Sequence, residues 1–403
     1  MQREPGENTR AVHLPEAHLP QERPVGMPVW RSATFAFPDA QAYADVLGDQ
    51  RPGYSYSRID NPTVDAFASG VAALEGTNLD HDVRGQAFAS GMAAITGAFL
   101  TLTRQGTHVV ASSAVYGGTF GLLNGVLARF GVETDFVDIT DLDQVRAAIR
   151  PDTAVVYAET LANPTMTVAD LPELAEIAHD AGARLVVDST FASPVVCRPL
   201  EHGADLVVHS ATKYLGGHSD VTGGVVAGRA ELVDALRAVR VDTGGSMSPD
   251  DAFLLHRGLE TLPLRVRRQN ATAMVYAATI ARHAGVARVD YPGLTEHPGH
   301  ETARRLFDSG PEGTRFGAVV TVTPHGGYGA GMRFADGLRL VKVAPSLGGT
   351  HSMVSHVAST THRQMDEARL RAAGIDPGAV RVSVGLEDAE DLIADTMRSL
   401  DRI

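Results

Sequence analysis

Residues 184–213 read RLVVDSTFASPVVCRPLEHGADLVVHSATK, and this stretch decides the fold class. It contains two apolar LVV runs, at 185–187 and 206–208, and each run ends in polar residues. Short apolar runs bounded in this way are typical of buried parallel strands, and ligands bind beyond the carboxyl ends of such strands. The first candidates for a functional site are therefore the polar residues that follow the two runs: Asp188, Thr190, Ser210, Thr212 and Lys213.

The same pattern continues toward the amino terminus. Short β-rich runs alternate there with helical patterns, and the runs are residues 85–90, 108–112, 134–139 and 153–159. The helical patterns cover residues 91–104, 118–131, 141–149 and 170–182. Strand-helix alternation at this spacing predicts an α/β fold with a mostly parallel central sheet that carries helices on both faces.

Beyond residue 250 the alternation gives way to a second, smaller α/β pattern. A long helical stretch covers residues 250–285, and further strands or helices are expected at 318–326, 338–349, 365–374, 379–385 and 390–400. We expect an extended amino-terminal arm over 1–62, a cofactor-binding domain over 63–258 and a carboxy-terminal domain over 259–403. The arm carries several aromatic residues, which predict packing against a neighbouring subunit.

Composition excludes several classes of protein. The chain has 403 residues, 44% of them hydrophobic, and a formal net charge of −13, which disfavours binding to nucleic-acid phosphates or anionic lipids. Cys197 is the single cysteine, so neither an internal disulfide nor a cysteine-based zinc site is possible, and the histidine spacing suggests no metal. Without a signal peptide or membrane span in the sequence, we expect a cytoplasmic protein.

The polar residues after the strands suggest a particular cofactor. A Ser-Gly turn at 90–91 precedes a helix, whose first amides, from Gly91 and Met92, suit a phosphate. The sequence lacks GxGxxG after the first strand and lacks GxxxxGK[ST], which argues against dinucleotide and nucleoside-triphosphate sites. A lysine, a buried aspartate and a phosphate site together fit pyridoxal 5′-phosphate, with Lys213 as Schiff-base residue and Asp188 on the ring nitrogen.

Nine motifs in order then carry a resemblance to a known family. They are YSYSRIDNPT (54–63), SGMAA (90–94), VYGGT (115–119), ETLANPTM (159–166), VVDSTFASP (186–194), HSATKYLGGHSD (209–220), SPDDAFLLHRGLETL (248–262), APSLGG (344–349) and RVSVGLED (381–388). The sequence resembles the Cys/Met-metabolism enzymes that depend on pyridoxal phosphate. This family includes cystathionine γ-lyases, cystathionine γ-synthases, methionine γ-lyases and O-acylhomoserine sulfhydrylases. The resemblance implies an aspartate-aminotransferase-like architecture, fold type I.

The resemblance also implies roles for individual residues. Lys213 and Tyr116 would be catalytic, and Tyr116 would also stack on the cofactor ring. The substrate carboxylate would bind Arg381 with help from Asn163 and Ser346. Tyr56 and Arg58 would reach the phosphate of a neighbouring subunit's cofactor, so the implied assembly is a dimer of dimers, a homotetramer with shared sites. The remaining cofactor contacts would come from Gly91, Met92, Asp188, Thr190, Ser210 and Thr212.

The implied reaction is γ-elimination on a sulfur-containing amino acid such as cystathionine, methionine or homocysteine, which yields an α-keto acid, ammonia and a thiol. The alternative is γ-replacement, as in cystathionine γ-synthase or O-acylhomoserine sulfhydrylase, because both reactions share an intermediate. An aminotransferase would keep Lys213 and Asp188, but the YSR and SLGG motifs argue against it. An inactive scaffold would not need to retain these residues. Gly118 replaces the cysteine usual in methionine γ-lyases, and His351 replaces an acid usual in cystathionine-handling members, so the substrate stays open.

Overall fold

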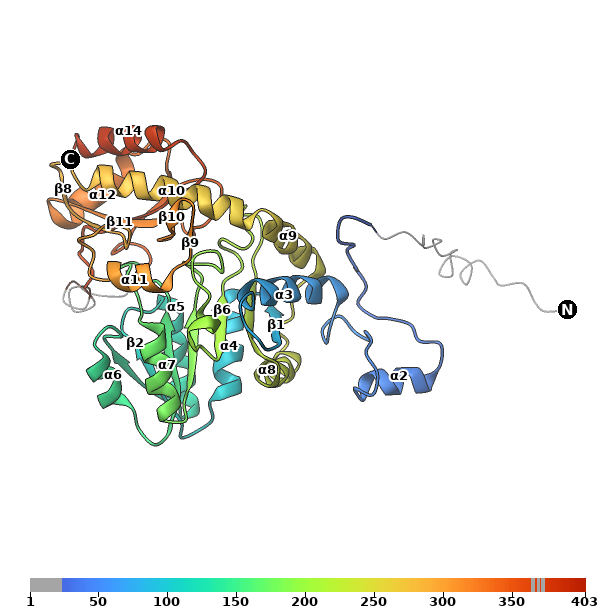
Figure 1. The fold of residues 1–403 in the computed structure, drawn as a ribbon. Coiled ribbons are helices and arrows are strands. Elements are labelled where there is room, and N and C mark those ends of the chain that lie inside the picture. The colour runs from blue at the N-terminus through green and yellow to red at the C-terminus, as the bar shows by residue number, and fades with distance from the viewer. Residues whose placement is uncertain (1–23, 364–366, 368–369, 371–373) are drawn as a thin grey trace.

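The computed structural model describes residues 24–403 except 364–366, 368–369 and 371–373. A large α/β body holds a seven-stranded sheet, a smaller domain holds a five-stranded sheet, and an amino-terminal segment extends away from the body (Figure 1). No helix among the described residues has the length and apolar character that crossing a membrane requires. The predicted fold class is confirmed.

The central sheet has the strand order β1-β7-β6-β5-β4-β2-β3. All neighbouring pairs from β6 to β3 are parallel, whereas β7 runs antiparallel to both β6 and β1. The sequence analysis did not identify β7. The strands are β1 (Val83–Phe88), β2 (His108–Ser112), β3 (Glu133–Val137), β4 (Thr153–Glu159), β5 (Arg184–Asp188), β6 (Leu206–His209) and β7 (Gly224–Arg229).

Both faces of this sheet are buried, as expected for parallel strands. Val186 and Val187 are adjacent in β5, yet they belong to two separate hydrophobic clusters on opposite faces. The helices of this body are α3 (Pro62–Glu75), α4 (Gly91–Leu102), α5 (Gly117–Gly121), α6 (Leu142–Ala148), α7 (Leu171–Asp180) and α8 (Ala230–Thr243). The large body also contains one π-helical turn (Leu122–Val126) and two 3₁₀ turns (Leu127–Phe130 and Pro199–His202). The first two of these turns interrupt the continuous helix predicted over 118–131.

Helices α9 (Pro249–Glu260) and α10 (Leu262–Ile280) lead into the smaller domain. Its main sheet has the order β12-β13-β14-β11-β8, mostly antiparallel. The strands are β8 (Val286–Asp290), β9 (Ser309–Gly310), β10 (Gly313–Thr314), β11 (Val319–Pro324), β12 (Lys342–Val343), β13 (Met353–His356) and β14 (Val380–Ser383), and the helices are α11 (His300–Leu306), α12 (Gly327–Gly337) and α14 (Ala389–Leu400). Most of the run 338–349, which the sequence predicts as a strand, is irregular, and the helix expected over 365–374 lies largely outside the described residues.

The amino-terminal segment is not extended throughout, contrary to the sequence prediction. It contains α2 (Ala40–Leu47), which begins because the Asp39 side chain accepts the Ala42 amide, and which ends at Gly48. The Trp30 amide donates to Thr63 Oγ1 at 2.9 Å, and this bond ties the segment to the start of α3. Beyond that anchor, α2 stands apart from the body (Figure 1).

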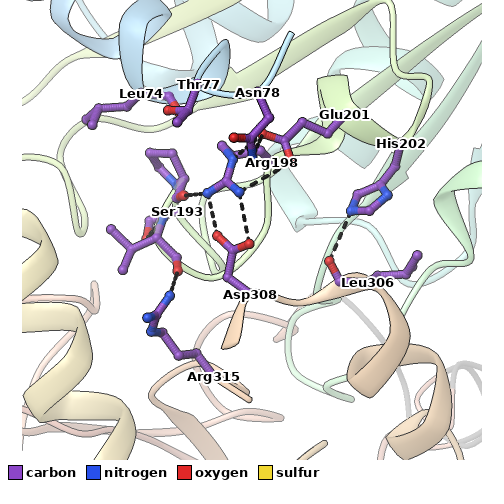
Figure 2. A network of polar contacts seen from close by, with 12 residues as sticks. Leu74, Thr77, Asn78, Ser193, Arg198, Glu201, His202, Leu306, Asp308 and Arg315 are labelled. Carbon is purple, nitrogen blue, oxygen red and sulfur yellow. Dashed lines mark hydrogen bonds and ion pairs between the residues drawn. The ribbon is translucent and has the colours of Figure 1, made fainter. Parts of the chain in front are cut away.

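A polar network fastens the two domains to each other (Figure 2). Arg198, from the large body, donates to Glu201 Oε1 at 2.5 Å and to Asp308 Oδ1 at 2.9 Å, and Asp308 belongs to the smaller domain. Arg315 of the smaller domain donates to the Val195 carbonyl at 3.1 Å. These bonds join the loop after β5 to the β9–β10 hairpin and therefore help to fix the domain arrangement.

Candidate active site

A cavity of about 330 Å³ lies beyond the carboxyl ends of β4, β5 and β6, between the two domains. It is the location that ligands occupy in open α/β sheets. Eleven of the thirteen residues proposed from the sequence line it: Gly91, Met92, Tyr116, Asn163, Asp188, Thr190, Ser210, Thr212, Lys213, Ser346 and Arg381.

Lys213 projects into this cavity from the loop after β6. Its Nζ donates to Ser346 Oγ at 2.9 Å, and burial together with nearby Arg381 lowers the pKa of the amine to about 8. The loop is held by Arg265, which donates to the carbonyls of Tyr214 at 2.9 Å and Gly258 at 2.7 Å. Arg265 is buried, and its guanidinium is used by these carbonyls.

Asp188 lies at the end of β5 and is also buried. Its Oδ1 accepts the Thr190 amide at 2.9 Å, and the Tyr157 hydroxyl lies 3.5 Å from Oδ2. Burial raises the pKa of this carboxyl, because loss of water disfavours the charged form. The Thr190 hydroxyl accepts the Ser210 amide at 2.8 Å and so links β5 to the loop that carries Lys213.

The start of α4 forms the opposite wall. The Ser90 side chain caps the helix by accepting the Ala93 amide at 3.1 Å. Among the described residues, the amides of Gly91 and Met92 have no acceptor. A Cβ on Gly91 would lie 2.7 Å from the Ser210 Cβ, so glycine is required for these segments to approach each other.

Arg381, in β14, reaches the cavity from the smaller domain. Its guanidinium donates to Asn163 Oδ1 at 3.0 Å and to the Ser346 carbonyl at 3.1 Å, and it lies over the Phe191 ring at 5.9 Å. Burial lowers its pKa only to about 10, so the side chain stays cationic near neutral pH. The arrangement offers a fixed positive charge to a substrate carboxylate.

Glu159 is a cavity residue to which the sequence analysis gave no role. It ends β4 and accepts the Tyr116 amide at 2.6 Å and the Asn163 amide at 3.3 Å. Its position at the end of a predicted strand, at the same sheet edge as Asp188 and at the start of the ETLANPTM motif, made it a candidate in the sequence, but no role followed from the residue types. Tyr116 itself is 46% exposed, with its ring packed closely over Gly118.

Tyr56 and Arg58 do not line this cavity. Both lie in the amino-terminal segment, where the Arg58 guanidinium donates to the Val241 carbonyl at 2.6 Å and lies 5.6 Å from the Tyr56 ring centre. Any contact of theirs with a cofactor would therefore have to be made in another subunit. That role stays a prediction.

The residues present fit pyridoxal phosphate at three separate points. The unpaired amides at the start of α4 suit a phosphate. A cationic ring nitrogen would favour the charged form of the buried Asp188 carboxyl, which burial disfavours, and the partly neutral Lys213 amine suits an aldehyde. The fold and this cavity thus define the class, an α/β enzyme that depends on pyridoxal phosphate.

Comparison with known proteins identifies the family. Residues 8–401 match the model of the Cys/Met metabolism PLP-dependent enzymes, and the chain belongs to this family. It is 42% identical to the L-methionine γ-lyase of Pseudomonas putida over 98% of this chain and 97% of that protein. It is 41% identical to the cystathionine γ-lyase of Bacillus subtilis over 94% of this chain and 95% of that protein.

Solved structures agree with this assignment. A crystal structure of a protein described as an O-acetylhomoserine (thiol)-lyase from Campylobacter jejuni has a TM-score of 0.88 and 30% identity, covering 96% of this chain and 97% of that one. That structure carries a pyridoxyl-lysine phosphate adduct. The family relationship thus establishes pyridoxal phosphate as the cofactor, whereas the relatives are named for different reactions.

Proposed function

We propose that this enzyme catalyses γ-elimination on a sulfur-substituted amino acid such as methionine, homocysteine or cystathionine. With one water consumed, the C–S bond at Cγ breaks, and the products are a thiol (hydrogen sulfide from homocysteine), an α-keto acid and ammonia. The observation that carries the proposal is the grouping of a partly neutral lysine amine with a fixed guanidinium in one cavity. The similarity to methionine γ-lyases supports elimination.

The guanidinium of Arg381 sets the orientation of the substrate in this proposal. Asn163 Oδ1 and the Ser346 carbonyl hold its donors, and a substrate carboxylate would complete the arrangement. Fixing the carboxylate also fixes Cα relative to Lys213, because Ser346 contacts both side chains.

Bound pyridoxal phosphate supplies an electron-withdrawing ring that makes the substrate's Cα and Cβ hydrogens acidic. Lys213 then acts as the base: a pKa of about 8 leaves part of its amine neutral near neutral pH, so it can accept the Cα proton and later move a proton at Cβ. The Tyr116 hydroxyl donates a proton to the departing sulfur. Asp188 would hold the ring nitrogen and would keep it protonated.

The second candidate function is γ-replacement, and one feature favours it. A second hollow of about 730 Å³ shares Thr212, Thr222, Pro345 and Ser346 with the cavity. Through it, a thiol could reach the intermediate after the first group has left. His351 lines this hollow, which supports its proximity to the distal part of a substrate.

The test is a product assay on the holoenzyme. L-methionine, L-homocysteine and L-cystathionine are each supplied, and thiol, α-keto acid and ammonia are quantified. In parallel, an O-acylhomoserine with a thiol is assayed for thioether formation, and the Lys213→Ala variant is the blank. We expect stoichiometric thiol, keto acid and ammonia. Thioether formation without elimination from any of the three substrates would replace this proposal with γ-replacement.

A further inference from the structure

Glu159 lines the cavity yet takes no part in the chemistry proposed above. Its side chain is 6% exposed, and it approaches two segments that are separate in the chain: the loop after β2, which carries Tyr116, and the turn after β4, which carries Asn163. These two segments supply a face for the cofactor ring and a contact for the substrate carboxylate.

The contacts divide between the two carboxylate oxygens. Oε1 accepts the Tyr116 amide at 2.6 Å, and Oε2 accepts the Asn163 amide at 3.3 Å. Tyr116 precedes α5 without a side-chain cap of its own, so this bond is a direct anchor for the start of that helix. Asn163 in turn accepts from Arg381, which extends the connection into β14 of the smaller domain.

We propose that Glu159 is a positioning residue that holds Tyr116 and Asn163 as a single unit. The face that covers the cofactor ring and the site that binds the substrate carboxylate are thereby set together rather than independently. This inference rests on the roles proposed above for Tyr116 and Asn163.

Burying the Glu159 carboxyl group costs free energy of folding. Its retention in the cavity therefore argues that its two acceptor oxygens are needed there. Burial and the neighbouring Asp188 raise the pKa of Glu159 to about 8, while the two amide bonds act in the opposite direction. Both oxygens of a carboxyl group keep lone pairs that accept an amide, even when one oxygen carries a proton, whereas the NH₂ nitrogen of glutamine donates and cannot accept. Glutamine can therefore satisfy only one of the two amides, and the other amide would face the NH₂ donor.

The experiment compares Glu159→Gln with three reference variants in holoenzyme. Visible circular dichroism of the bound pyridoxal phosphate reports the ring environment, and KM for the best substrate reports the carboxylate site. Tyr116→Phe and Asn163→Ala calibrate each readout separately. Glu173→Gln, at a partly exposed glutamate on α7 that lies 3.7 Å from Arg146, controls for the loss of one acidic group.

We expect Glu159→Gln to change the dichroism and to raise KM roughly tenfold, since an unsatisfied buried amide is costly. Glu173→Gln should change neither readout. An effect of Glu159→Gln on only one readout, or on neither, overturns the proposal. If Glu159→Gln does not fold, Glu159→Asp, which keeps two acceptors on a shorter side chain, is judged by the same criterion.

Failure of the proposed function would look different. It would appear in the wild type as an absence of thiol release. The carboxylate site is then measured through the affinity for an amino acid without a γ-substituent, such as L-alanine, detected in the cofactor spectrum. The dichroism of the bound cofactor can be measured without turnover, so this readout remains valid if the proposed function fails.

Discussion

Lys213 and Lys342 are the only lysines in the sequence, which makes covalent attachment of the cofactor easy to localise. With a pKa of about 8 for Lys213, the neutral amine becomes more abundant as pH rises toward that value. Because only the neutral amine attacks an aldehyde, the rate at which apoprotein takes up pyridoxal phosphate should rise with pH and level off above about 8. Stopped-flow absorbance measures this rate.

Borohydride reduction followed by peptide mapping identifies the attachment site. We expect the label on Lys213, unchanged uptake in Lys342→Arg, and a folded but inactive Lys213→Ala protein. A labelled Lys342 peptide, or full activity in Lys213→Ala, would contradict the assignment of Lys213.

Gly118 controls the position of the Tyr116 ring. A Cβ at 118 would lie 2.5 Å from Tyr116 Cε1 and 2.9 Å from Met92 Sδ, so both side chains would have to move. Because both can move, Gly118→Cys should cost only about 1 kcal/mol in stability and should still alter the cofactor dichroism and kcat.

Gly121→Ala is the matched control for that change, since a Cβ there meets nothing within 4 Å and the residue lies in the same helix, α5. Thermal melting and steady-state kinetics compare the two variants. If Gly118→Cys has as little effect on melting temperature and kinetics as Gly121→Ala, the position of the Tyr116 ring does not depend on Gly118.

Roles could be predicted from the sequence for side chains that would contact the cofactor or substrate, and could not be predicted for side chains that act through contacts with the backbone. Asp188 and Lys213 follow apolar runs, and the chemistry of the cofactor suggests both. Glu159 lies in the same position relative to its strand, but its partners are backbone amides, which leave no trace in residue types. The buried position of Arg265 could not be predicted either, because it donates to the Tyr214 carbonyl in a loop that is distant in the chain.

Among the secondary-structure elements, the β9–β10 hairpin depends on Arg198 for its attachment to the large body (Figure 2). Arg198→Met would leave Glu201 and Asp308 facing each other without a cation. We expect a loss of about 2–4 kcal/mol in the free energy of unfolding. Asp308→Asn should cost less, because Arg198 keeps Glu201.

Urea unfolding at one protein concentration measures these losses. Arg304→Met is the control, since Arg304 pairs with Glu301 on the exposed surface of α11 at 3.4 Å and should contribute under about 1 kcal/mol. Equal effects of Arg198→Met and Arg304→Met would mean that the network does not stabilise the domain arrangement.

Helices and strands could be predicted from the sequence wherever a periodic run keeps to the alternating strand-helix order. The parallel strands β2 to β6 correspond to apolar runs that the sequence analysis identified. Strand β7 was missed because it follows directly on the glycine-rich loop after Lys213, and its antiparallel pairing interrupts the strand-helix order. The helix predicted over 118–131 is broken by a π-turn, a kind of irregularity that often occurs near functional sites and depends on packing.

For the whole molecule, assembly is the main open prediction. The amino-terminal segment carries large apolar side chains that are about half exposed, Trp30, Tyr43 and Leu47, and α2, which contains the last two, stands apart from the body. A neighbouring subunit would bury them and would bring Tyr56 and Arg58 to another site.

Mixed dimers test that arrangement. Arg58→Ala and Lys213→Ala chains, each inactive alone, are coexpressed with different tags, and the heterodimers are purified through both tags. We expect partial activity, because one of the two sites then holds native residues from both chains. No recovery in verified heterodimers would mean that Arg58 does not complete a neighbour's site.

The strand order of the central sheet has a consequence for biosynthesis. β1 pairs only with β7, yet β1 ends at Phe88 and β7 begins at Gly224. At cellular synthesis rates, the ribosome needs on the order of ten seconds to make the intervening residues. During that time Ala87 and Phe88, both buried in the finished protein, have no sheet to join. A Cβ on Gly224 would lie 2.2 Å from the Ser90 carbonyl, so the turn before α4 packs directly against the start of β7 in the folded protein. We therefore expect that a nascent chain stalled before β7 does not retain pyridoxal phosphate.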